Sequence, residues 1–149
     1  MRILVLSDNH SRDIDFNFNE FDYVIHSGDR GSFDDDGILM VRGNCDFRGE
    51  KTISTIINDK KVLITHGDLY GVKEGLTRLS LLALEKEVQY VFYGHTHCPS
   101  FFEYRGIKFI NPGAYLDGRY VIIDDFKITF YRENKIEKTI ENKWWFKCY

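Results

Sequence analysis

The sequence predicts a β-rich α/β domain whose functional site lies at the carboxyl ends of its strands. Its 149 residues suit a single domain, 1–149, because domains typically run ~100–200 residues. Short apolar runs alternate with polar loops, a pattern typical of buried strands. Several of these runs end directly at polar residues of metal-binding types, and open α/β sheets bind ligands at that edge.

Strands outnumber helices in the predicted element order. Strands are predicted at 2–7, 22–27, 38–42, 52–57, 61–65, 90–94, 100–104, 106–110, 119–124 and 126–132. Two pairs are predicted to form hairpins, through Asn58-Asp59 and through Asp124-Asp125. One helix is predicted over about 75–88, where Leu76, Leu79 and Ala83 share a face. The loops after the first two strands leave little room for long crossover helices.

Composition narrows the class of protein. The net charge of −3 argues against a strong nucleic-acid surface, which would be basic. Three cysteines at irregular spacing argue against a disulfide framework and favour the cytoplasm. No apolar run approaches the ~18–20 residues of a membrane-spanning helix, and the apolar start is cut by Asp8, so it is predicted to be a strand rather than a signal peptide.

The polar residues after the strands suggest a metal site. They lie in five fragments: Asp8-Asn9-His10, Gly28-Asp29, Gly43-Asn44-Cys45-Asp46, Thr65-His66-Gly67-Asp68 and Gly94-His95-Thr96-His97. Neutral imidazoles and carboxylates suit borderline divalent metals. The two oxygens of Asp29 allow it to bridge two cations, and two ions ~3.5–4 Å apart can share one hydroxide and clamp a phosphoryl group.

In this order, and followed by Asn111-Pro112-Gly113, the fragments resemble the motifs of the calcineurin-like metallophosphoesterases. The closer likeness is to the small bacterial and archaeal phosphodiesterases and to Vps29, over residues 1 to about 114. The resemblance implies a metallophosphoesterase-type β-sandwich flanked by helices, here shortened. It implies one ion held by Asp8, His10, Asp29 and His97, and a second held by Asp29, Asn44, His66 and His95. Manganese is the ion most commonly implied, with nickel, iron and zinc as alternatives.

The implied activity is hydrolysis of a small phosphodiester by a hydroxide that bridges two metal ions. The seven implied ligands would then also be the catalytic residues. The alternative is a Vps29-like interaction module whose metal site is structural. Short loops favour the module, whereas the intact set of ligand-type residues favours the enzyme.

The chain departs from the family pattern at two positions near this set. Larger relatives carry a histidine after the motif asparagine, where it helps the leaving group depart; here that residue is Cys45. Cys45 would be a poor proton donor, and it is either substrate-facing or a small buried residue. Asp68 stands where many small relatives have a second histidine.

Other conspicuous residues have simpler interpretations. His26 and Asp46 are predicted to support the site rather than to bind metal, and Cys98 is predicted to be a packed thiol. Asn111-Pro112-Gly113 is predicted to shape a turn that supports the site. The cluster Trp144-Trp145-Phe146 is predicted to pack back onto the domain, with a homo-oligomer contact as the alternative.

Overall fold

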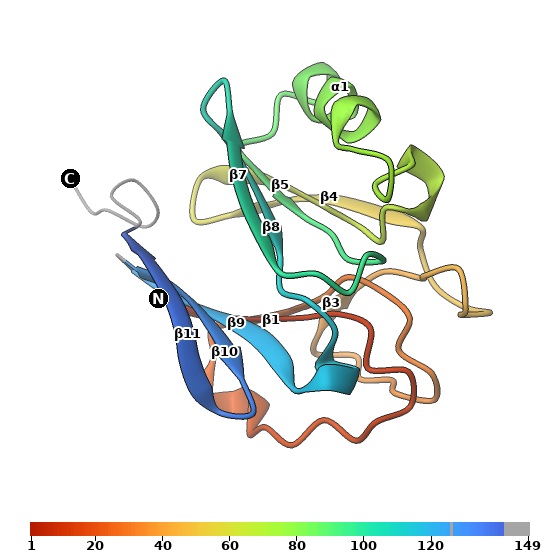
Figure 1. Cartoon of the computed structure of the whole chain (residues 1–149), viewed down its shortest axis with the longest axis vertical. Coiled ribbons are helices and arrows are strands. Elements are labelled where there is room, and N and C mark those ends of the chain that lie inside the picture. The colour runs from red at the N-terminus through yellow and green to blue at the C-terminus, as the bar shows by residue number, and fades with distance from the viewer. Residues whose placement is uncertain (126, 142–149) are drawn as a thin grey trace.

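Two β-sheets stack face to face in the computed structural model, which describes residues 1–125 and 127–141 (Figure 1). The six-stranded sheet A has the order β11-β10-β9-β1-β2-β3 and the five-stranded sheet B the order β4-β5-β6-β8-β7. Sheet A contains β1 (Arg2–Leu6), β2 (Tyr23–His26), β3 (Leu39–Met40), β9 (Arg119–Asp124), β10 (Lys127–Arg132) and β11 (Lys135–Glu141). Sheet B contains β4 (Thr52–Ile57), β5 (Lys60–Thr65), β6 (Tyr90–Phe92), β7 (Ser100–Tyr104) and β8 (Ile107–Asn111).

The strands that precede the polar fragments are parallel. In sheet A, β1 pairs with β2 and β2 with β3 in parallel, and in sheet B the same holds for β5 with β6 and β6 with β8. Their carboxyl ends therefore meet at one edge of each sheet, as the sequence predicted. The remaining pairs are antiparallel, including the predicted β4–β5 hairpin. Its turn residues Asn58 and Asp59 both have positive φ, 46° and 65°, as a type I′ turn requires.

The main core lies between the two sheets. Its fully buried side chains come from both sheets and are mostly β-branched or aromatic, and they include Ile3, Val5, Ile25, Ile64, Phe92 and Ile110. Their removal from water is the main driving force for stacking the sheets.

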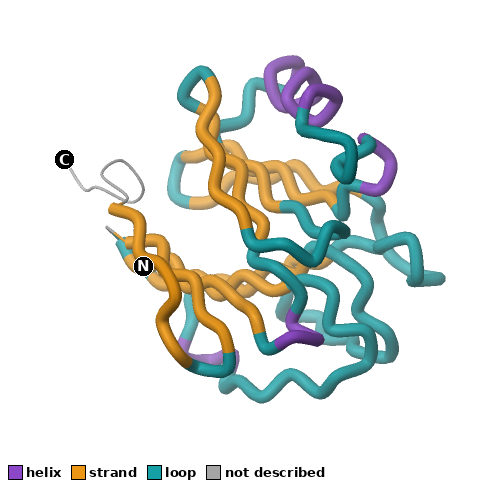
Figure 2. Tube along the Cα trace, in the orientation of Figure 1, coloured by secondary structure: helices purple, strands orange, loops and turns teal. Residues whose placement is uncertain are grey.

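The outer faces of the two sheets are covered differently (Figure 2). Sheet B is covered by α1 (Thr77–Glu85), whose Leu79 and Ala83 pack with residues such as Phe109. Sheet A is covered by the 11–22 loop, which contains the short helix η1 (Phe18–Glu20). Phe16 of this loop packs on Tyr120, with ring centroids 4.9 Å apart. Aromatic loop residues thus replace a flanking helix, and the predicted sandwich with shortened helices is confirmed.

Three element predictions need correction. The helix is shorter than 75–88 because Gly75, at φ 143°, and Glu87, at φ 55°, cannot continue it. The strand predicted at 38–42 is reduced to β3. Strand β11 was not predicted, because its residues are almost all exposed and show no apolar alternation.

The two remaining short helices are η2 (Asp68–Tyr70) and η3 (Tyr115–Asp117). Residues Trp144, Trp145 and Phe146, for which packing or a subunit contact was predicted, lie outside the described residues. None of the described helices has the length and apolar character needed to cross a membrane.

Candidate metal centre

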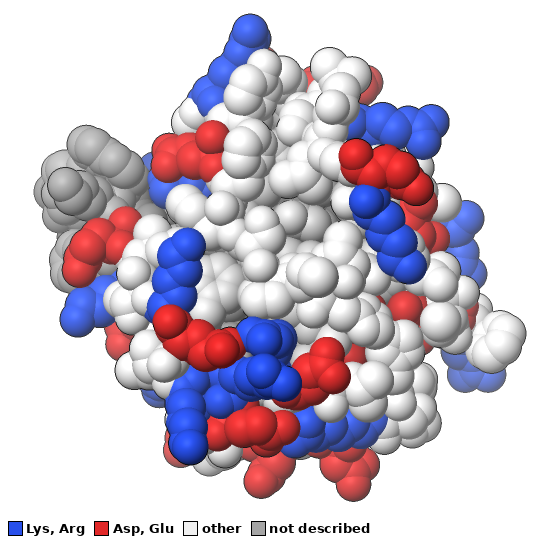
Figure 3. Space-filling view, viewed as in Figure 1, with Lys and Arg blue, Asp and Glu red and all other residues white. Residues whose placement is uncertain are grey.

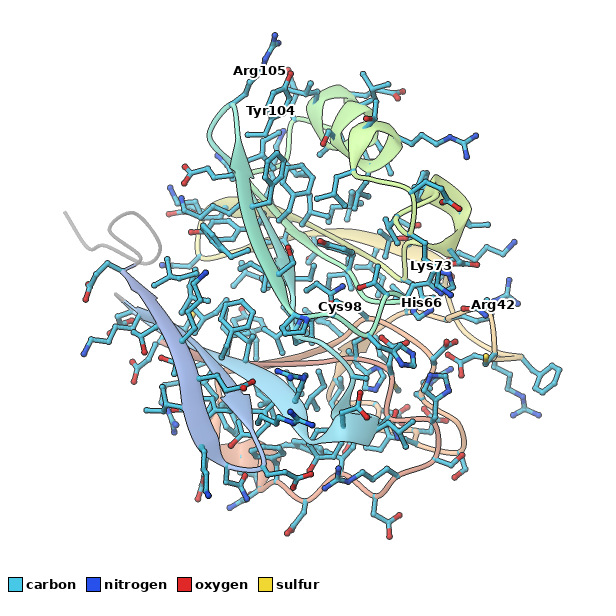
Figure 4. The ribbon with its side chains drawn as sticks, viewed as in Figure 1. Arg42, His66, Lys73, Cys98, Tyr104 and Arg105 are labelled. Carbon is cyan, nitrogen blue, oxygen red and sulfur yellow. The ribbon has the colours of Figure 1, made fainter. Side chains whose placement is uncertain are left out.

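Six of the seven predicted ligands meet where the strands end. Asp8 and His10 follow β1, Asp29 follows β2, His66 follows β5, and His95 and His97 follow β6. Figure 4 shows His66 on the same side of the molecule as Arg42 and Lys73, far from Tyr104 and Arg105 at the tip of the β7–β8 hairpin. The fold therefore brings together residues that lie far apart in the sequence; Asp8 and His97, for example, are 89 positions apart.

These residues form two adjoining groups of three. In the outer trio (Asp8, His10, His97) and in the deep trio (Asp29, His66, His95), ligand atoms all lie within 4.8 Å of one another. The facing imidazole nitrogens are 3.1 Å apart in the outer trio, between His10 Nε2 and His97 Nε2, and 3.2 Å apart in the deep trio, between His66 Nε2 and His95 Nδ1. Nitrogen and carboxylate donors at this spacing suit a divalent cation.

Asp8 provides the test of whether the outer trio fits a metal ion. Its Oδ2 accepts hydrogen bonds from Ser7 Oγ at 2.6 Å and from the His95 backbone N–H at 3.1 Å. Its Oδ1 is buried without a hydrogen-bond partner among the described residues. That oxygen lies 3.3 Å from His97 Nε2 and 3.7 Å from His10 Nε2. An unsatisfied buried carboxylate oxygen is costly, and a cation between these atoms would satisfy it.

Asp29, a member of the deep trio, also faces the outer trio. Its Oδ2 is 3.1 Å from His66 Nε2 and 3.7 Å from His10 Nε2, and its Oδ1 accepts a hydrogen bond from the Cys45 N–H at 2.8 Å. Burial alone would raise the pKa of Asp29, but the hydrogen bonds from His66 and Cys45 outweigh it and lower the pKa to about 2. Asp29 is therefore ionised at neutral pH and within reach of both trios.

The imidazole of His66 is oriented by a backbone carbonyl group. Its Nδ1 lies 2.8 Å from the Ser27 carbonyl oxygen, which directs Nε2 toward the deep trio. Burial opposes the charged imidazole, but the hydrogen bond with Asp29 and the charge of Asp8 raise the pKa of His66. Burial and the neighbouring His66 lower the pKa of His95. The deep trio thus combines one imidazole whose pKa is raised with one whose pKa is lowered, and a cation would compete with the proton on the first.

Five of the predicted ligands have left-handed backbone conformations. The φ values are 53° for Asp8, 44° for His10, 56° for Asp29, 71° for His95 and 61° for His97. Asp and His tolerate this region better than most residues, yet each such residue costs on the order of 1–3 kcal/mol. Backbone strain of this kind, concentrated on ligand-type residues, is typical of a functional site.

Glycines of the motifs allow the loops to approach closely. A Cβ at Gly43 would lie 2.1 Å from Asp29 Oδ1, and one at Gly94 would lie 2.0 Å from Ser7 Oγ. Either side chain would push a carboxylate of the centre out of place. Gly43 and Gly94 are therefore needed for their lack of a side chain.

The loop after β3 carries Asn44, Cys45 and Asp46. The Asp46 carboxylate accepts hydrogen bonds from the backbone N–H groups of Asp29, Arg30 and Gly43 at 2.8, 3.0 and 2.8 Å. Asp46 thus positions Asp29, in line with its predicted supporting role. Asn44 is exposed, and its Nδ2 lies 3.6 Å from Cys45 Sγ.

Cys45 is exposed rather than buried. Its Sγ forms a third group of ligand-type atoms with His10 and Asp29. Partial desolvation of the sulfur and the negative charge of Asp29 raise the pKa of this thiol. The structure therefore favours the alternative in which Cys45 faces the open side of the centre.

Other predicted supporting residues lie behind the centre. His26 is buried, with Nε2 2.9 Å from Asn9 Oδ1 and Nδ1 accepting the Gly28 N–H at 3.1 Å. Burial lowers the pKa of His26 to about 3, so it is neutral. Asn111 donates to Thr96 Oγ1 at 2.9 Å and holds the loop between His95 and His97, as predicted. The prediction of a packed thiol at Cys98 is wrong, because Cys98 is exposed.

Sequence reasoning missed Ser7 and Ser27. Ser7 holds Asp8, and the Ser27 carbonyl holds His66. A hydroxyl immediately before a ligand was a visible signal for Ser7. A backbone carbonyl leaves no such signal.

Comparison with known proteins agrees with this geometry. Residues 1–122 match the calcineurin-like phosphoesterase superfamily domain. The chain is 31% identical over 126 residues to the probable metallophosphoesterase YsnB of Bacillus subtilis, covering 76% of this chain and 75% of that protein. A predicted phosphoesterase from Streptococcus pneumoniae, of known structure, is 28% identical with a TM-score of 0.80, over 94% of this chain and 97% of that one.

A similar fold occurs in Vps29 of Entamoeba histolytica, solved with Zn²⁺, at 18% identity and a TM-score of 0.71 over 96% of this chain and 100% of that one. The fold, the clustered ligand-type residues and the match over most of the chain define a metal-dependent phosphoesterase. The chain belongs to the calcineurin-like phosphoesterase superfamily.

Proposed function

We propose that this protein is a phosphodiesterase that uses two divalent metal ions. The observation that carries the proposal is Asp8 Oδ1, a buried and unpartnered carboxylate oxygen among the described residues that faces His10 and His97. The deep trio lies beside it, with Asp29 within reach of both. Two adjoining cation sites are the arrangement that phosphoryl transfer by paired metals needs.

The ligands divide between the two ions. Asp8, His10, Asp29 and His97 would hold one, and Asp29, Asn44, His66 and His95 the other. When bound, the pair supplies an activated hydroxide and neutralises charge on the phosphoryl group. We propose Mn²⁺ as the ion, with Ni²⁺, Fe²⁺ and Zn²⁺ also compatible with nitrogen and oxygen donors.

The open side of the centre indicates where substrate enters. The His10 and His97 side chains are 27% and 38% exposed, whereas His66 is fully buried. Substrate therefore approaches from the outer trio and from Cys45. Figure 3 shows basic and acidic side chains interspersed on the visible face, which therefore lacks the continuous basic surface that a nucleic-acid polymer needs.

The chain has no spare imidazole for protonating a leaving group. It contains five histidines; four belong to the trios and His26 is buried and neutral. Diesters with acidic leaving groups, which depart without a proton, are therefore the best substrates for this centre.

Hydrolysis of bis-p-nitrophenyl phosphate with added Mn²⁺ tests the proposal. We expect Asp8→Ala and His97→Ala to abolish turnover and a chelator to do the same. The exposed Asp36→Ala serves as a matched control, with unchanged turnover. Undiminished activity in both site variants would exclude this function.

A Vps29-like interaction module is the second candidate. An apolar hollow of about 360 Å³ between α1 and β7, lined by residues that include Leu81, Phe102 and Tyr104, favours it. All three side chains are exposed. Metal-loaded protein that turns over none of a panel of diesters would support the module over the enzyme.

A further inference from the structure

Cys45 lies at the junction of the two trios. Its Sγ, a His10 ring nitrogen and an Asp29 carboxylate oxygen are all within 4.8 Å of one another. His10 belongs to the outer trio and Asp29 to the deep trio. The thiol therefore lies beside both proposed ion sites, on the side that is open to solvent.

The backbone fixes the thiol in this position. The Cys45 N–H donates to Asp29 Oδ1 at 2.8 Å, and Asp46 accepts from the N–H groups of both Asp29 and Gly43. Gly43 packs so tightly on Asp29 that no Cβ fits there. An ion bound by Asp29 therefore has the Cys45 backbone beside it, and the observed conformation places Sγ within reach of the same carboxylate.

A second observation points to a ligand at the same place. Asp8 Oδ1 is fully buried, has no hydrogen-bond partner in the described part of the chain, and lies 3.7 Å from His10 Nε2. The unsatisfied charge of Asp8 and the group that contains Cys45 thus share His10. Carboxylate, imidazole and thiol together form a donor set for a borderline or soft cation.

We propose that Cys45 is a conditional metal ligand, which binds a soft divalent cation such as Cd²⁺ as a thiolate and leaves Mn²⁺ uncoordinated. The inference rests on the proposed function because it uses the same metal centre. Soft ions prefer thiolate, whereas Mn²⁺ prefers oxygen ligands. On binding, a sulfur–metal bond forms, the S–H bond breaks, and the proton passes to the buffer.

Thiolate binding would have a functional consequence. Catalytic metal sites keep one coordination position open, and structural sites are closed by protein ligands. Cys45 lies on the open side, so its thiolate would occupy the position that substrate needs. The same centre would then be active with Mn²⁺ and blocked by a soft ion.

Cadmium titration followed by ultraviolet absorption tests the inference without relying on turnover. Binding through Cys45 produces a thiolate-to-cadmium charge-transfer band. We expect this band in the wild type and in the Cys98→Ser/Cys148→Ser control, which keeps Cys45 as its single thiol. We expect Cys45→Ser, introduced into that control, to lose the band and to bind Cd²⁺ at least about tenfold more weakly, since losing a residue that only supports a metal ligand already costs about 10–100-fold.

Elemental analysis of the same samples separates the two proposals. Cadmium bound by the wild type without the band, or a band that is absent from the variant with Cys45 as its single thiol, would overturn the role of Cys45 alone. Wild type that binds no cadmium would overturn the metal centre itself. In the Mn²⁺-loaded enzyme, Cys45→Ser should need at least about tenfold more Cd²⁺ for half-inhibition, in proportion to its weaker binding.

Discussion

The deep and outer trios contain the same kinds of residues but are held differently. In the deep trio, His66 is fully buried and oriented by the Ser27 carbonyl, and Asp29 is fixed by Cys45 and Asp46. In the outer trio, only Asp8 is buried, while His10 and His97 are partly exposed. The protein therefore fixes two buried members of the deep trio but one of the outer trio, whose two histidines stay accessible to substrate.

The largest effect is expected where the two trios adjoin. Asp29→Asn removes the ionised carboxylate that both proposed ions need. Because metal chemistry supplies several kcal/mol of transition-state stabilisation, we expect turnover to fall by about 10³-fold or more, at ~1.4 kcal/mol per tenfold. Steady-state kinetics with bis-p-nitrophenyl phosphate measures this.

The exposed Asp36→Asn is the control for Asp29→Asn, and it should leave turnover unchanged. A fall of less than tenfold in Asp29→Asn would contradict a shared ligand.

Removing one imidazole from each trio tests whether the deep trio retains its ion better than the outer trio. His97→Ala should keep about one ion per chain after dialysis, because the deep trio and its supports are intact. His66→Ala should keep fewer, because it removes the ligand that lies closest to Asp29. Elemental analysis gives the stoichiometry, and circular dichroism checks folding. Equal retention by the two folded variants would show that the trios do not differ.

The sequence predicted most of the centre because of where strands end. Asp8, His66 and His95 each follow an apolar run, and a run of that kind indicates a buried strand. Parallel pairing then places such ends at one edge. The positive φ angles of these loops could not be predicted, because they depend on contacts such as Gly94 against Ser7.

The errors of prediction have physical causes. Strand β11 lies at the edge of sheet A and is exposed and charged. This composition protects an edge strand from pairing with other chains, but it lacks the apolar alternation from which a strand is predicted. Its turn, Glu133-Asn134, has φ values of 47° and 64°, and Asn134 was the one local signal for a hairpin. The loop that replaces a helix over sheet A depends on Phe16 and Tyr120, residues too far apart in sequence to connect beforehand.

A smaller effect is expected from the support of the deep trio. Asp46→Asn leaves a single oxygen to accept three backbone N–H groups, so the loop and Asp29 shift. Such supporting changes typically cost about 10–100-fold in metal affinity. Competition with a chelator measures the affinity for Mn²⁺. Saturating Mn²⁺ should restore most of the turnover, whereas a direct catalytic role for Asp46 would leave it low.

The smallest expected effect concerns His26, whose buried imidazole makes the free energy of unfolding depend on pH. The pKa of His26 is about 3 in the folded protein and ~6.5 in an unfolded chain. The unfolded state therefore binds more protons between these values. The stabilisation from neutral His26 is complete above pH ~6.5 and is lost as the pH falls toward 3, by up to ~1.4 kcal/mol per unit.

Urea unfolding between pH 7 and 5, with a chelator present, measures this slope in the wild type and in His26→Gln. Glutamine keeps a polar group near Asn9 but does not titrate. The raised pKa of His66 acts in the opposite sense, since its contribution is complete below pH ~6.5 and is lost as the pH rises through the raised value. His66 is present in both proteins, so it cancels in the difference. Parallel stability profiles would mean that His26 is not held neutral in the folded protein.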